Sequence, residues 1–156
     1  MSEREDDVTP TLAETARRRA DLHEALVAVE RTISSPAVGR EADWSKDVLR
    51  QLEDLSHTID EHVEVTERPG GLYDEISERA PRLATKIERL RQEHPEMRDA
   101  TLALTKKLAT TGVESETELS DLRDELQRLL GRIVRHRQLG ADLVWEAYNL
   151  DIGGVE

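Results

Sequence analysis

Apolar side chains recur at alternating steps of three and four residues along four segments of the chain. This spacing keeps side chains on one face of an α-helix, so each segment is predicted to form an amphipathic helix. The segments are residues 9–33, 44–67, 81–109 and 115–148. The repeat is occupied by Leu22, Leu26, Val29 and Ile33, by Val48, Leu52, Leu55 and Ile59, by Leu83, Ile87, Leu90, Met97, Leu104 and Leu108, and by Leu119, Leu122, Leu126, Leu129, Ile133 and Leu143.

Capping and breaking residues support these boundaries. Thr9 precedes Pro10, a pair that suits the start of a helix, and Ser115 with Glu118 forms a capping box. The Pro-Gly-Gly sequence at residues 69–71 ends the second segment, and a short helical piece follows at residues 72–80.

Four amphipathic helices with short connections predict an all-α fold, an antiparallel up-down four-helix bundle. It would carry a short extra helix between the second and third long helices. The bundle is expected to be one domain over residues 9–150. Residues 1–8 are predicted to be a disordered acidic leader, and residues 151–156 a C-terminal tail.

Composition narrows the classes of function. The formal net charge of −12 disfavours nucleic acid and anionic membrane surfaces as partners, since both need a basic face. The absence of cysteine removes disulfides, thiolate metal sites and cysteine nucleophiles. No secretory signal or membrane-spanning run is recognised, so a cytoplasmic location is expected. No catalytic triad or H-E-x-x-H motif can be assembled, which argues against an enzyme.

The five histidines carry the candidate chemistry. His62, His94 and His136 each fall on the apolar repeat of a different helix, so they are predicted to point inward. His23 lies on the flank of the first repeat, and His57 lies about 140° from His62 and is predicted to be exposed. A single inward histidine is most often a hydrogen-bonded core residue. Several of them, on separate helices, favour a metal site, because neutral imidazole is a common metal ligand.

Three stretches, "HVEVTERPGGLYDEI", "RLRQEHPEM" and "RHRQLGADLVWEAY", resemble the hemerythrin-like (HHE cation-binding) family. The resemblance implies a four-helix bundle whose histidines and carboxylates hold non-haem iron, used in dioxygen binding, sensing or iron handling. It places His23, His62, His94 and His136 on the family's histidine positions, and Glu93 with His94 keeps a Glu-His pair.

The carboxylate positions depart from the family pattern. Thr66 stands four residues after His62, where the family has Glu, and Glu67 follows it. Gly140 stands four residues after His136, and neither it nor Thr66 can bridge two irons. Glu67 can replace the missing ligand only by reaching in from the flank of its helix. The predicted metal ligands are His23, His62, Glu67, His94 and His136.

The function predicted from these residues is non-haem metal binding, with iron as the expected ion and a role in oxygen or redox sensing or in iron handling. The metal ion, and through it dioxygen, are the expected partners. The alternative is a degenerate bundle without metal that serves as a protein-interaction or structural module. Haem between two facing histidines is a third reading, which no attachment motif supports.

Overall fold

The computed structural model describes residues 8–149 and 152 of the chain. The predicted leader at residues 1–8 and tail at residues 151–156 lie almost entirely outside the described residues. Over the described part every regular element is a helix. The elements are α2 (Pro10–Ser34), α3 (Glu41–Glu67), α4 (Leu72–Arg79), the 3₁₀ turn η1 (Pro81–Leu83), α5 (Ala84–Thr111) and α6 (Glu116–Tyr148). The all-α prediction is confirmed, and the short helix expected between the second and third long helices is α4.

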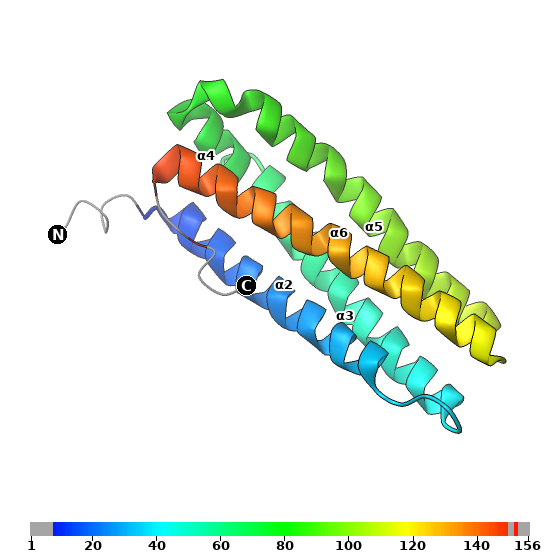
Figure 1. Ribbon diagram of the computed structural model, residues 1–156. Coiled ribbons are helices and arrows are strands. Elements are labelled where there is room, and N and C mark those ends of the chain that lie inside the picture. Colours follow the sequence, from blue (N-terminus) through cyan, green and yellow to red (C-terminus); the bar gives the residue numbers. More distant parts are fainter. Residues whose placement is uncertain (1–7, 150–151, 153–156) are drawn as a thin grey trace.

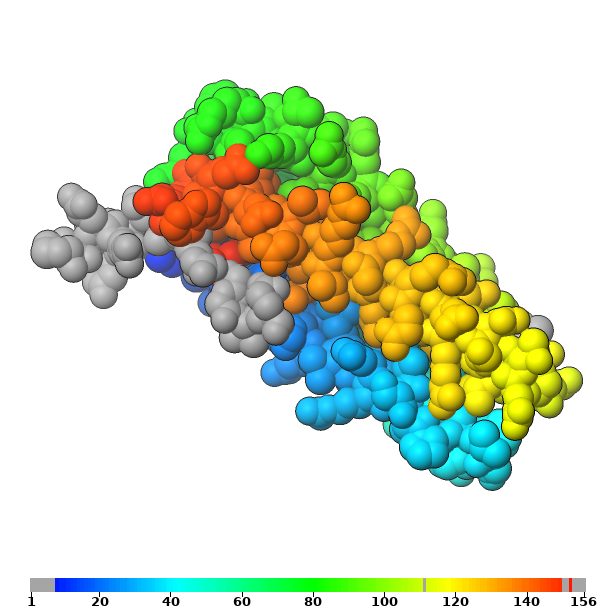
Figure 2. All heavy atoms as spheres, in the orientation of Figure 1, coloured from blue at the N-terminus to red at the C-terminus, as the bar shows by residue number. Residues whose placement is uncertain are grey.

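The four long helices lie side by side as a bundle (Figure 1). Helix α2 packs on α3, α3 on α5, α5 on α6, and α6 back on α2, so the four enclose one interior. Figure 2 shows side chains of α6 filling the surface between α2 and α5. No helix in the described ranges has both the length and the apolar character needed to cross a lipid bilayer.

The helix starts follow the local sequence. The Thr9 hydroxyl accepts a hydrogen bond from the Leu12 amide at 3.1 Å, and the Ser115 hydroxyl accepts one from the Glu118 amide at 3.1 Å. Each cap satisfies an amide that has no partner inside its helix. Pro95 stands inside α5, but the helix continues through it.

The turn before α4 depends on two glycines. Gly70 has a φ of +74°, which favours glycine, and its amide donates to the Asp74 carboxylate at 2.8 Å. A Cβ on Gly71 would lie 2.7 Å from the Val65 carbonyl oxygen and 2.8 Å from that of Arg68. The turn therefore folds tightly against the end of α3 and sets α4 beside it.

The interior contains two apolar clusters. One lines the half of the bundle where α2 connects to α3 and α5 connects to α6, and it includes Trp44, Leu52, Leu126 and Ile133. The other lies under α4 and includes Leu12, Ile76, Leu90, Leu143 and Tyr148. Between them run polar or charged side chains, most of them buried, which we call the polar layer: Thr15, Arg19, His62, Thr66, His94, His136 and Arg137.

Candidate metal centre

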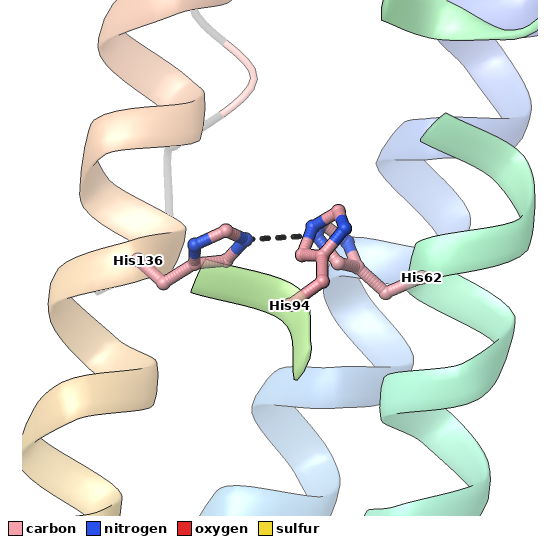
Figure 3. A group of neighbouring side chains, drawn as sticks. All are labelled: His62, His94 and His136. Atoms are coloured by element: carbon pink, nitrogen blue, oxygen red, sulfur yellow. Dashed lines mark hydrogen bonds between the residues drawn. The ribbon is translucent and has the colours of Figure 1, made fainter. Parts of the chain in front are cut away.

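Three histidines from three helices meet in the polar layer. His62 comes from α3, His94 from α5 and His136 from α6, and Figure 3 shows their rings converging at one level of the bundle. The ring centroids lie 5.1 Å apart for His62 and His94, 5.2 Å for His62 and His136, and 4.9 Å for His94 and His136. One ligand atom from each histidine lies within 4.8 Å of those of the other two.

The shortest approach is between Nε2 of His62 and Nε2 of His136, at 3.2 Å. Two nitrogens bound to one ion at about 2.0–2.1 Å lie about 3.3 Å apart at a tetrahedral angle. The observed distance matches that separation. The same distance suits a hydrogen bond in which one ring donates to the other.

Two carboxylates orient the rings. Oε1 of Glu93 lies 2.6 Å from Nδ1 of His136, and Oε2 of Glu67 hydrogen-bonds Nδ1 of His94. A carboxylate accepts the Nδ1 proton, which leaves the lone pair of a neutral ring on Nε2. Histidines that bind metals are usually held in this way, with the second nitrogen donating to a carboxylate. The two glutamates therefore leave Nε2 of His94 and of His136 free to act as ligands.

Burial keeps the imidazoles neutral. Loss of hydration lowers the pKa of His62 well below its usual value, and the nearby His136 and His94 add to the effect. Burial also lowers the pKa of His94 to about 3. The pKa of His136 falls for the same reason, although its hydrogen bond to Glu93 opposes the shift. Neutral imidazole is the form that binds metal, so all three rings are in the ligating state near pH 7.

One ring nitrogen of the cluster is unsatisfied. Nδ1 of His62 is buried and finds no hydrogen-bond partner among the described residues. A neutral His62 can place its single proton on either nitrogen. If the proton sits on Nδ1, the lone pair of Nε2 faces His136 and can serve an ion.

A small cavity of about 30 Å³ adjoins the cluster. His62, His136, Thr66, Tyr73 and Gly140 are among its lining residues. A space of that size holds a water molecule or a similarly small ligand. Gly140 has no side chain, and a Cβ there would meet nothing within 4 Å. The missing side chain therefore contributes to the open space beside the histidines.

Three of the five predicted ligands meet in the cluster, and Glu67 and His23 do not bring a ligand atom to it. His62, His94 and His136 come together as expected, and the prediction that His57 is exposed is confirmed, with 76% of its side chain accessible. Glu67 does reach in from its flank, but it meets Nδ1 of His94 and is not among the clustered ligand atoms.

His23 does not join the cluster. It is half-buried on α2, and at the level of the three histidines the same helix presents Arg19 instead. The apolar repeat of α2 continues backwards through Arg19, Thr15 and Leu12, all of them buried. This backward extension was the signal that would have placed Arg19 inside. The side chain of Arg19 donates to the carbonyl oxygen of Arg137 at 2.7 Å.

Sequence reasoning missed two further contributors. Arg137 is buried beside His136, and Tyr73 of α4 places its hydroxyl 3.3 Å from Nε2 of His94. Burial raises the pKa of Tyr73 above its usual value, so the phenol keeps its proton when no ion is present. An arginine next to an inward histidine, and a tyrosine on a short connecting helix, carry no distinctive spacing.

Comparison of the chain with models of known protein families, with curated proteins and with solved structures gives no match in any of the three. The hemerythrin-like assignment therefore rests on the residues alone and stays a prediction.

Proposed function

We propose that this protein is a metal-binding bundle of the antiparallel up-down, hemerythrin-like kind, and that His62, His94 and His136 hold one transition-metal ion. The observation that carries the proposal is the pair of Nδ1 contacts to Glu67 and Glu93. Each contact leaves the Nε2 lone pair of its ring available as a metal ligand. The donor set fits a single ion, since only three clustered ligand atoms are found among the described residues.

Iron stays the predicted ion, and a role in oxygen or redox sensing or in iron handling stays the predicted use. Imidazole donors suit iron, zinc, copper and nickel alike, so the identity of the ion has to be measured. A bound transition metal would supply the affinity for dioxygen or another small donor that the protein side chains lack. The cavity beside His62 and His136 gives such a donor room next to the ligands.

Metal analysis of the purified chain tests the proposal. We expect a single ion per chain, either co-purified or restored by adding ferrous, ferric, zinc or cupric salts separately after chelator treatment. His136→Ala should abolish uptake, because it removes one of three ligands. His57→Ala, at an exposed position, and His23→Ala, outside the cluster, are the controls and should leave uptake unchanged. A folded wild-type chain that takes up none of these ions would refute the proposal.

The alternative is a metal-free bundle that serves as a protein-interaction or structural module. The observation that favours it is the polar layer itself, whose histidines already contact each other, Tyr73 and the two glutamates. Only Nδ1 of His62 is left over among those ring nitrogens. Under this alternative, His136→Ala changes the free energy of unfolding equally with and without added metal salts.

A further inference from the structure

Tyr73 is held in place from several sides. It is the second residue of α4 and only 2% exposed. Its ring lies nearly parallel to that of His94, with an interplanar angle of 14° and centroids 5.9 Å apart. The guanidinium of Arg91 lies 5.4 Å from the Tyr73 ring centre, and Nη1 of Arg91 lies 3.6 Å from the Glu67 carboxylate that orients His94. One set of contacts therefore fixes both rings.

The hydroxyl of Tyr73 faces the cluster at a distance from His94 that fits two ligands of one ion. Its distance to Nε2 of His94 is 3.3 Å, and the distance between Nε2 of His62 and Nε2 of His136 is 3.2 Å. Two ligand atoms at tetrahedral angles on an ion with bonds near 2.0–2.2 Å are separated by about 3.3–3.6 Å. The four atoms thus form two pairs with nearly the same separation, each close to the expected one.

Tyr73 also lies beside Thr66 at the end of α3. Thr66 is buried and uses its hydroxyl to donate to the carbonyl oxygen of His62 at 2.9 Å. Thr66 and Tyr73 line the same cavity as His62. An oxygen donor that α3 does not supply at position 66 is therefore available from α4, which the tight turn at Gly71 sets against the end of α3.

From this geometry, and resting on the proposed metal site, we infer that Tyr73 is a fourth protein ligand and that the site is built for ferric ion. A phenolate is a hard, anionic oxygen donor, and it binds trivalent iron in preference to divalent zinc. On binding, the Tyr73 hydroxyl loses its proton to solvent and its oxygen bonds the ion. Three neutral imidazoles and one phenolate then form the ligand set.

Visible absorption tests the inference, because a ferric phenolate absorbs visible light by charge transfer and ferric imidazole sites without phenolate lack that band. The metal-stripped chain is loaded with ferric citrate, and iron per chain is measured beside the spectrum. Tyr73→Phe keeps the ring but removes the oxygen. Tyr148→Phe is the matched control, since the chain has two tyrosines and Tyr148 bonds Glu75 away from the cluster. We expect the band in wild type and Tyr148→Phe, and its loss in Tyr73→Phe.

A second measurement does not depend on the folding of Tyr73→Phe. In the Tyr148→Phe chain Tyr73 is the sole tyrosine, so ring-deuterated tyrosine labels it alone. Resonance Raman bands of the ferric protein that shift on deuteration would confirm a Tyr73 phenolate on the iron.

The outcomes separate this inference from the proposed function. Stoichiometric ferric ion without tyrosine ring bands, or with a visible band that survives Tyr73→Phe, would overturn the role of Tyr73 and leave the three-histidine site standing. A wild-type chain that binds zinc or ferrous ion but no ferric ion would also overturn it. Failure to bind any of these ions would overturn both.

Discussion

Replacing Glu93 tests whether the carboxylates of the polar layer serve metal binding. Glu93 accepts a hydrogen bond from Nδ1 of His136 at 2.6 Å, a short, charge-assisted contact. Hydrogen bonds to charged groups are worth about 1.5–3 kcal/mol. We take the whole energy of this hydrogen bond to stabilise the form of His136 that binds metal. At 1.4 kcal/mol per factor of ten, its loss then lowers metal affinity by about 10-fold to 150-fold. Losing the partner of a ligating histidine typically costs about 10–100-fold, which agrees.

Two variants at position 93 separate the contribution of the negative charge from that of the hydrogen-bond acceptor. Glu93→Gln keeps an oxygen that can accept the Nδ1 proton but removes the charge, so we expect a loss near 10-fold. Glu93→Ala removes acceptor and charge together, so we expect a loss near 100-fold. The control is Glu96→Gln on the same helix. The Glu96 side chain is 61% exposed, and its only described ion pair is with Arg132, at 3.5 Å. The metal affinity of Glu96→Gln should therefore equal that of wild type.

Competition against a chromophoric chelator at neutral pH gives the dissociation constants. Urea unfolding in the presence of a strong chelator shows that each variant is folded before metal is added. The reasoning is refuted if Glu93→Ala binds metal as tightly as Glu96→Gln does. It is also refuted if the two Glu93 variants lose affinity only in proportion to their loss of folding stability.

Three further predictions concern stability. The metal-free protein should lose stability as the pH falls below about 6.5, because the unfolded chain protonates histidines whose folded pKa values are lowered, to about 3 for His94. Urea unfolding at a series of pH values should show a slope of up to about 1.4 kcal/mol per pH unit for each of the three histidines, and a stability that does not fall with pH would contradict this. Gly131→Ala and Gly140→Ala should each stabilise α6 by about 0.5–1 kcal/mol in urea, since a Cβ at either position meets nothing within 4 Å; a loss of stability at Gly131 would contradict this. Ser115→Ala should cost about 1 kcal/mol by removing the cap of α6, and equal melting temperatures would contradict the cap's role.

The apolar repeat predicted most of the fold because burial follows helical phase. Every repeat position of the third long helix, including His94 and Thr101, is buried in η1 or α5. The same phase argument placed His62, His94 and His136 inside and His57 outside. Helix ends were less accurate, and α3 begins at Glu41, three residues before the predicted start at Trp44, because the turn before it offers no side-chain cap.

The candidate site was harder to predict because its remaining parts do not depend on phase alone. The axial position of α2 relative to the other helices decides which of its turns faces the three histidines. In the structure that turn carries Arg19 and not His23. Glu67 lies beside the apolar stripe, so whether it binds an ion or a histidine depends on which neighbour it reaches. Tyr73 enters from a short helix whose position is set by the turn at Gly71, a tertiary effect with no repeat to reveal it.

The polar layer has a consequence for how the molecule opens. It divides the interior into two apolar halves: α2, α5 and α6 contribute to both, whereas α3 contributes only to the first and α4 only to the second. Such halves can unfold as separate cooperative units, and amide hydrogen exchange would then detect two opening free energies instead of one. An ion bound between them would be lost when either half opens, so it would link the two transitions by mass action, at about 2.7 kcal/mol when its free concentration is a hundred times its dissociation constant. The polar layer would then separate two independently opening halves in the metal-free chain and couple their opening in the metal-bound chain.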